Sequence, residues 1–363
     1  MKHVDEYRDS ELIKPLVAEL QKSVTKPVRL MEVCGTHTMA IFRNGVRSIL
    51  PEGMEIVSGP GCPVCVTSAS HMDAFIAMAE IPGVRVTIFG DLFRVPGSKN
   101  SLAYASSQGA KVDVVYSSMD ALELAKKHPE DLVVFLGVGF ETTNPGIAAT
   151  ILAAKREQIS NFCVFSTHKV IPGPLDLLMQ DPELQINALL CPGHVSSIIG
   201  AQAYQPFVDK YGLSCVVAGF EPTDLLNGLI LIARQIGENK PSVENIYPRV
   251  VSWEGNKRAM AMVAEVFEPV DMEWRGLGVL PDSGLAIRED YAQFDAQKRL
   301  EIEIPESEEA KGCMCGQILK GQTIPPKCPL FDTRCTPANP VGPCMVSSEG
   351  TCAAYHKYGR EDN

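Results

Sequence analysis

The chain has 363 residues, of which 45% are hydrophobic and 21% charged, so it has the composition of a globular protein and the length of two or three domains. Its formal net charge of −11 disfavours a nucleic-acid binder, because neutralising phosphates requires an excess of Lys and Arg. No run of about 18 apolar residues occurs, and the charged N-terminus has no apolar signal segment, so we expect a cytoplasmic protein with no membrane partner.

In chain order, the first predicted element is a helix over the first twenty residues, with Asp9 or Ser10 as its cap and Pro15 marking a kink or a late start. Short apolar runs ending in polar or glycine-rich turns follow at residues 28–33, 55–57, 84–89 and 112–116, with helical stretches at 68–80 and 119–127. A second set of such runs covers residues 132–138, 162–165, 186–190 and 214–218. Buried strands that alternate with helices predict parallel sheets covered by helices on both faces.

Two stretches of the second set echo each other. Residues 133–154 and 215–235 each run from a strand through Gly-Phe-Glu and Thr into an amphipathic helix. A last globular stretch is expected near residues 254–275. Beyond residue 301 the sequence is first acidic and then dominated by cysteine, proline and glycine. This segment is predicted to be a small appended module that something other than a hydrophobic core holds together.

Twelve cysteines are the unusual feature of the composition. A secreted protein uses many cysteines as a disulfide framework, but a chain of this length needs no such staples. In a cytosolic protein, closely spaced cysteines more often bind metals or carry redox chemistry. We therefore expect thiolates to carry the chemistry of this protein.

The tail holds six cysteines within forty residues, namely Cys313, Cys315, Cys328, Cys335, Cys344 and Cys352. A structural zinc site usually shows CxxC pairs, and none occurs here. A disulfide knot is disfavoured in a reducing compartment. A [4Fe–4S] cluster needs four thiolates without fixed spacing, and Cys328-Pro329 is similar to the cysteine-proline step of ferredoxin motifs. We favour the cluster, with the two remaining cysteines as a redox pair, although spacing alone does not separate iron from zinc.

A second group of cysteines lies in Gly-Pro-Gly-Cys-Pro-Val-Cys-Val-Thr, residues 59–67, between a short strand and a helix. Redox CxxC motifs have this context, in which the N-terminus of the helix lowers the pKa of a thiol. The turn presents Cys62 and Cys65 at the carboxyl end of a parallel sheet, where α/β proteins keep their sites. The alternative is two buried cysteines in a structural turn.

A third cysteine, Cys34, also follows a strand, within Met-Glu-Val-Cys-Gly-Thr-His-Thr at residues 31–38. We expect it on the same sheet edge as Cys62 and Cys65, where three thiolates would form a site for a soft metal such as iron, zinc or copper. His37 could bind the metal, orient a ligand or carry protons, or it could only form a local hydrogen bond.

The remaining candidates have weaker signals. Cys163, Cys191 and Cys215 lie in strand-like runs and are interpreted as core residues. His168 and His194 follow predicted strands, so they could face a cleft opposite Cys34 or be structural. Glu141 and Glu221 could close the same cleft or cap the helices that follow them. No G-x-G-x-x-G or Walker A motif occurs, so no nucleotide site is predicted.

Together, CGTHT at 34–38, GPGCPVCVT at 59–67, GFETTNP at 139–145, CPGHVS at 191–196 and the six-cysteine tail resemble the HypD family of hydrogenase maturation proteins over essentially the whole chain. The resemblance implies two similar α/β domains with parallel sheets flanking a cleft, over residues 1–130 and 131–270, and a C-terminal [4Fe–4S] domain over residues 271–363. Its implied function is a scaffold that assembles the Fe(CN)2CO group of [NiFe]-hydrogenase.

The resemblance also implies roles for the cysteines. Cys34 is expected to hold the iron, with Cys62 and Cys65 beside it as a thiol–disulfide pair or as further ligands. In the tail, the family pattern matches Cys313, Cys328, Cys335 and Cys352 as cluster ligands and Cys315 with Cys344 as the redox pair. The implied partners are a HypC-type chaperone, which shares the iron through its N-terminal cysteine, and a HypE-type cyanide donor.

The residues alone leave two other functional classes of protein possible. A thiol–disulfide oxidoreductase would use the tail cluster to supply electrons to Cys62 and Cys65, without a second iron. A purely structural zinc protein would leave the N-terminal cysteines unexplained.

Overall fold

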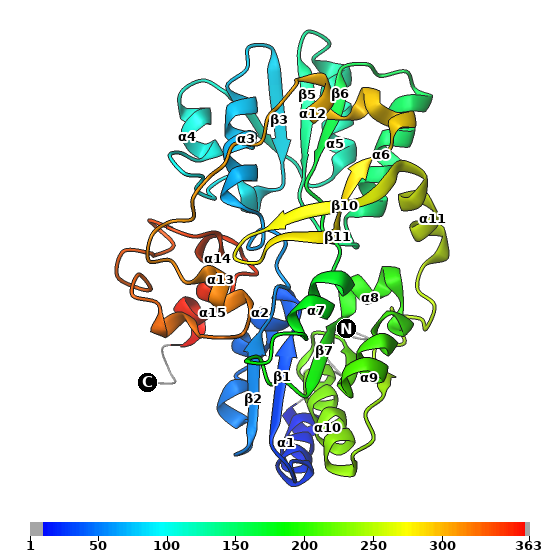
Figure 1. Cartoon of the computed structure of the whole chain (residues 1–363), viewed down its shortest axis with the longest axis vertical. Helices are drawn as coiled ribbons and strands as arrows, with labels where there is room; N and C mark the ends of the chain where they lie inside the picture. Colours follow the sequence, from blue (N-terminus) through cyan, green and yellow to red (C-terminus); the bar gives the residue numbers. More distant parts are fainter. Residues whose placement is uncertain (1–9, 360–363) are drawn as a thin grey trace.

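Two parallel β-sheets, lying one above the other along the long axis of the molecule, form the frame of the fold (Figure 1). The structure is a computed structural model that describes residues 10–359. One sheet has the strand order β2 (Met54–Ser58), β1 (Val28–Glu32), β7 (Ala188–Pro192), β8 (Ser214–Ala218) and β9 (Val243–Asn245). The other has the order β4 (Lys111–Val114), β3 (Val84–Ile88), β5 (Leu132–Gly137) and β6 (Phe162–Ser166). Every predicted strand is present, with small shifts of its ends, and the parallel α/β architecture is confirmed.

Helices cover both sheets. The longer ones are α1 (Ser10–Ser23), α2 (Gly35–Arg43), α3 (Ala69–Ala79), α5 (Ser118–Lys127), α6 (Asn144–Arg156), α10 (Pro222–Glu238) and α11 (Lys257–Val266). Shorter ones are α4 (Leu102–Ser107), α7 (Pro172–Leu178), α8 (Gly193–Ile199), α9 (Gln205–Tyr211), α12 (Ala296–Arg299), α13 (Cys315–Leu319), α14 (Pro343–Val346) and α15 (Thr351–Tyr358). The predicted helix cap at Ser10 coincides with the start of α1, whereas Asp9 lies outside the described residues. Within residues 10–359, no helix is long and apolar enough to span a membrane.

The chain crosses between the sheets instead of completing one before the other. β1 and β2 pair in one sheet, β3 to β6 form the second, and β7 to β9 return to the first. The two echoed stretches belong to different sheets, as β5 with α6 and β8 with α10. The predicted domain limits stay untested as such, but the limit between residues 130 and 131 runs between β4 and β5, which belong to one sheet.

An antiparallel hairpin, absent from the predicted elements, contacts loops that follow strands of both sheets. It comprises β10 (Phe267–Trp274) and β11 (Gly278–Ile287), and it crosses the middle of the molecule in Figure 1. Isolated bridges pair Trp274 with Thr67 and Gly284 with Lys169. The predicted limit between residues 270 and 271 falls within β10, because the alternation of buried and exposed residues in this strand is too irregular to identify it from sequence.

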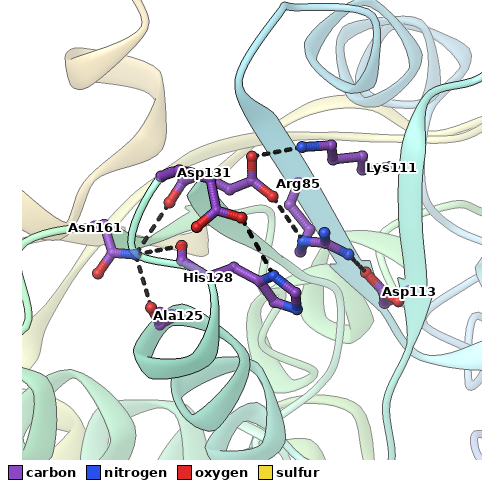
Figure 2. A network of polar contacts seen from close by, with 8 residues as sticks. Arg85, Lys111, Asp113, Ala125, His128, Asp131 and Asn161 are labelled. Atoms are coloured by element: carbon purple, nitrogen blue, oxygen red, sulfur yellow. Dashed lines mark hydrogen bonds and ion pairs between the residues drawn. The ribbon is translucent and has the colours of Figure 1, made fainter.

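A network of polar contacts fastens the amino-terminal ends of β3 to β6 (Figure 2). Buried Asp131 accepts hydrogen bonds from Lys111 Nζ (2.6 Å) and Arg85 Nε (3.0 Å), and Arg85 also pairs with Asp113 at 2.7 Å. Hydrogen bonds from Lys111 and Arg85 hold the pKa of the Asp131 carboxyl below its usual range, against burial. Asn161 Nδ2 donates to the carbonyls of Ala125, His128 and Asp131. Both carboxylate oxygens of Asp131 are already paired with cations. We therefore assign the neighbouring pair of His128 and Glu130 to the same structural network.

Candidate functional site

The loops that carry Cys34 and the Cys62–Cys65 motif leave neighbouring strands at one sheet edge. β1 and β2 pair in parallel, with Glu32 opposite Ser58, so both loops begin at carboxyl ends. The amide of Gly35 donates to the carbonyl of Gly61 at 2.9 Å. The expected placement of the three cysteines on one edge is therefore confirmed for their backbones.

Cys34 occupies the N-cap position of α2, a helix that the sequence did not reveal. Its backbone is extended, with φ −150° and ψ 120°, and its carbonyl accepts from the amide of Thr38 at 3.0 Å. Burial raises the pKa of the Cys34 thiol to about 12, and the charge of Glu349 adds to the rise. The N–H groups of His37 and Thr36 act in the opposite direction. The sulfur thus lies at the positive end of a helix, and the thiol keeps its proton at neutral pH.

Glu32 fixes the beginning of this helix. Its carboxyl accepts from the Cys34 amide at 3.1 Å and from the Thr38 hydroxyl at 2.5 Å. Burial raises the pKa of Glu32 to about 7. The hydrogen bonds hold the turn from β1 into α2 in one conformation, which positions the Cys34 sulfur.

Cys62 and Cys65 form a disulfide with their Cα atoms 5.2 Å apart. The amide of Cys65 donates to Cys62 Sγ at 3.2 Å. Helix α3 begins only at Ala69, and Ser68 is its N-cap. The pair therefore does not cap a helix, and the helix N-terminus expected at this motif is found instead at Cys34.

A polar turn of the tail, residues 347–350, closes the site from the other side. Glu349 accepts from the Thr36 hydroxyl at 2.5 Å, next to Cys34. The Ser347 hydroxyl lies 3.4 Å from Cys62 Sγ and donates to Asp91 at 3.1 Å. Sequence reasoning missed Glu349 and Asp91; the only available signal was a short polar stretch between two tail cysteines.

A cavity of about 490 Å³ lies beside these loops. Pro63, Val64, Asp91 and Glu349 are among its lining residues, and so is Tyr116, which is almost fully exposed. The Cys62–Cys65 loop and the polar turn of the tail thus share a cavity that reaches the molecular surface.

His37 and His194 both contact the aromatic ring of Phe220. The buried His37 ring is 4.8 Å from that of Phe220, and its Nε2 is 3.0 Å from the carbonyl oxygen of Gly219. Burial lowers the pKa of His37 to about 4, so the ring is neutral at pH 7. His194 stacks on the same ring at 4.2 Å, with its Nδ1 3.4 Å from the Thr36 hydroxyl. His37 thus forms a hydrogen bond with a backbone carbonyl that is distant in the sequence, and its role in metal binding or proton transfer stays a prediction.

The six tail cysteines are free thiols, five of them buried and Cys313 partly so. The side chain of Cys315 interacts with those of Cys313, Cys344 and Cys352, and Cys344 also interacts with Cys352. The hydrogen bond from Cys315 lowers the pKa of Cys313 to about 7. Cys328 Sγ lies 3.8 Å from the Gly312 carbonyl, and Cys335 Sγ accepts from the Val341 amide at 3.3 Å. The cysteine cluster is confirmed, but these contacts do not divide it into four ligands and a pair.

The tip of the β10–β11 hairpin packs the tail against the Cys62–Cys65 loop. The backbone amide of Arg275 donates to the Val66 carbonyl at 2.9 Å, and its Nε donates to the Thr67 carbonyl at 2.8 Å. The same guanidinium pairs with Glu309 of the tail. A Cβ atom on Gly276 would overlap Gly316, the residue after Cys315. The Cys62–Cys65 loop and the tail cysteines therefore belong to one packed region.

The weaker candidates divide into core and local roles. Cys163, Cys191 and Cys215 are fully buried, as predicted. Glu221 forms a capping box with Asp224 at the start of α10, which confirms the cap interpretation for this residue.

Glu141 does not cap the helix that follows it, and His168 agrees with the structural alternative. Thr143, not Glu141, occupies the N-cap of α6, and Glu141 Oε1 accepts from the amide of Ile171 at 2.8 Å. His168 is buried with its Nδ1 2.8 Å from the Ser166 hydroxyl. Its described contacts do not include the Cys34 loop.

A buried thiol at a helix N-terminus, a disulfide pair beside it and a cluster of free thiols define a thiol-centred α/β protein suited to soft-metal or redox chemistry. The sequence model of the HypD family, described as "Hydrogenase formation hypA family", matches residues 11–359. The chain therefore belongs to the HypD family of hydrogenase maturation factors.

Relatives match over nearly their whole length. The hydrogenase maturation factors HypD of Azotobacter vinelandii and Rhodobacter capsulatus are each 44% identical, over 99% of this chain and 98% of theirs. A putative hydrogenase expression/formation protein of Methanocaldococcus jannaschii is 42% identical, over 97% of this chain and 98% of its own. The similarity thus includes the tail as well as both sheets.

Proposed function

We propose that this protein is a cytoplasmic scaffold on which the Fe(CN)2CO group of [NiFe]-hydrogenase is assembled, with Cys34 as the residue that holds the iron. The observation that carries the proposal is the position of the Cys34 sulfur, at the N-terminus of α2 and beside the loop of Cys62 and Cys65. Membership of a family of hydrogenase maturation factors supports the same activity.

The environment of Cys34 suits a cation. The thiol holds its proton because burial and Glu349 disfavour the free anion. Iron(II) replaces this proton and compensates the anionic sulfur, while the N–H groups at the start of α2 support it. His37, neutral and buried three residues further along, orients the turn through its bond to the Gly219 carbonyl.

The redox state of Cys62 and Cys65 decides whether they can join Cys34. While Cys62 and Cys65 form a disulfide, neither of their sulfur atoms can act as an anionic ligand. Two electrons and two protons break the S–S bond and give two thiols, which can then lose their protons to bind the iron.

The donor set of the tail fits a [4Fe–4S] cluster. Six thiols lie in a segment with few large apolar side chains, and several interact directly with one another. Cys313, Cys328, Cys335 and Cys352 are the proposed ligands, and the interacting thiols of Cys315 and Cys344 the redox pair. When bound, the cluster supplies electrons one at a time. Ser347, three residues after Cys344, contacts Cys62 and so keeps the tail cysteines close to the Cys62–Cys65 pair.

Partners follow from the family and from the charge. We propose a HypC-type chaperone that shares the iron through a cysteine of its own, and a HypE-type donor of cyanide. The cavity beside Val64, Asp91 and Glu349 gives such groups access to the site. A net charge of −11 favours partner surfaces that carry Lys and Arg.

Anaerobic purification followed by metal and sulfide analysis tests the proposal. We expect tail-bound iron with equimolar sulfide, and additional iron when the protein is purified together with its chaperone. Cluster iron without any additional iron would favour the thiol–disulfide oxidoreductase. Zinc without iron or sulfide would contradict both functions.

A further inference from the structure

A second cavity, of about 300 Å³, lies where the two sheet units meet, and its lining residues include no cysteine. α6, α8, α11 and the β10–β11 hairpin surround it, and these elements converge on one side of the molecule in Figure 1. Its walls are mostly apolar and include Ile198, Met260, Val263, Phe267 and Leu285. A cavity of this size is at the lower end of small-molecule sites.

Two buried polar side chains of the GFETTNP motif line this cavity. Glu141 is 6% exposed and Asn144, the first residue of α6, is 1% exposed. Neither Glu141 Oε2 nor Asn144 Oδ1 has a hydrogen-bond partner among residues 10–359. The Ile171 amide holds the other oxygen of Glu141, so the carboxyl has a fixed orientation. Buried acceptors without partners are rare, and a bound donor is the ordinary explanation.

The charges around Glu141 favour a cationic donor. Burial raises the pKa of its carboxyl to about 7, and no cation appears among the causes that shift it. Arg288 also lines the cavity, but its half-exposed guanidinium lies 3.8 Å from Glu268. A positively charged donor supplies what this carboxyl lacks, because charge-assisted hydrogen bonds are stronger than neutral ones.

We propose that this cavity binds a primary amine in its ammonium form, with a compact apolar body. The ammonium donates hydrogen bonds to Glu141 Oε2 and Asn144 Oδ1, and the apolar body packs between Met260, Phe267 and Leu285. The ligand joins α6 of one sheet unit to α8 of the other. The site shares no residue with the thiol centre, so it stands or falls independently of iron assembly.

The test is titration of the full chain, labelled with 13C at the methionine methyl groups, with benzylamine, benzyl alcohol and toluene. The Met260 resonance is assigned from a Met260→Leu variant. Benzylamine is expected to shift this resonance in a saturable way and to bind at least about tenfold more tightly than benzyl alcohol. No saturable shift with benzylamine, or equal affinity for benzyl alcohol or toluene, would overturn the proposal.

Two variants locate the site. Glu141→Gln keeps an oxygen for the Ile171 amide but replaces the free acceptor by a donor, so benzylamine affinity should fall by about tenfold to a hundredfold. Ala264 is exposed at the mouth of the cavity, and Ala264→Trp should block entry without disturbing the core. Circular dichroism verifies that both variants are folded. Unchanged affinity in folded variants of both kinds would place the amine elsewhere.

Discussion

The backbone of Gly61 lies against the backbone nitrogen of Cys34, so that a Cβ atom at position 61 would overlap it. The hydrogen bond from Gly35 to the Gly61 carbonyl joins the same two loops. This contact is steric, and it sets the spacing between the proposed iron ligand and the disulfide pair.

Gly61→Ala should therefore separate the two loops. We expect the free energy of unfolding to fall by about 1–3 kcal/mol, the usual cost of overpacking, as measured by urea denaturation. Gly146→Ala is the matched control, because nothing lies within 4 Å of a Cβ there and the residue is inside α6. The control should be unchanged or stabilised by up to about 1 kcal/mol. Equal stabilities of the two variants would refute close packing of the loops.

Cys34→Ala should abolish hydrogenase maturation while leaving the brown absorbance of the proposed tail cluster intact. The reason is that the proposed iron ligand and the tail thiols lie on different segments of the chain. Cys163→Ala, in a buried core position, controls for the loss of a thiol and should retain maturation. Loss of the absorbance in Cys34→Ala would argue against two separate iron sites.

Cys335→Ala should lose the cluster and keep both sheets folded. Of the three apolar cores formed by residues 10–359, two contain no residue beyond Phe294, so these two do not depend on the tail. Far-ultraviolet circular dichroism and the visible spectrum measure the two effects separately. The exposed neighbour provides the control Arg334→Ala, which should keep the absorbance. Global unfolding of Cys335→Ala would show that the tail is not a separate module.

Lys169 gives a prediction for the pH dependence of stability. Burial lowers the pKa of its ammonium from 10.5 to about 7. Between pH 7 and pH 10.5, Lys169 keeps its proton in the unfolded chain but has released it in the native protein. The titration of Lys169 therefore makes the free energy of unfolding rise with pH in this range. Burial and the charge of Lys169 lower the pKa values of His71 and His168 to about 3, so both rings stay neutral over this pH range.

Lys169→Met removes this titration. Its advantage over the wild type in unfolding free energy should be largest near pH 7 and shrink by up to about 1.4 kcal/mol per pH unit above it. Urea denaturation at pH 7, 8 and 9 measures the difference, with the exposed Lys127→Met as the matched control. A difference that does not vary with pH would mean that Lys169 keeps its proton in the native state.

Much of the frame was predictable because buried parallel strands are continuous apolar runs. β7 and β8 are buried at every residue and were visible as such in the sequence. The sheet to which each strand belongs was not predictable. Strand order depends on pairing between distant segments, such as β1 with β7, and no local pattern records that choice.

The cysteines of the site were predictable, and their environment was not. Cys34, Cys62 and Cys65 follow strands that pair, so their common edge could be expected. The helix that begins at Cys34 was hidden, since its first turn has no acidic residue and its cap is not Ser, Thr, Asp or Asn. Glu349 reaches the site only through the packing of the tail, which depends on the whole fold.

Assembly of the iron group on Cys34 is best tested by the infrared spectrum of the protein purified anaerobically with its chaperone, from cells that contain the full maturation machinery. We expect bands of iron-bound cyanide and carbon monoxide in the wild type and their loss in Cys34→Ala, with the chaperone still bound. Persistence of these bands in Cys34→Ala, or their absence from the wild-type complex, would contradict assembly of the iron group on Cys34.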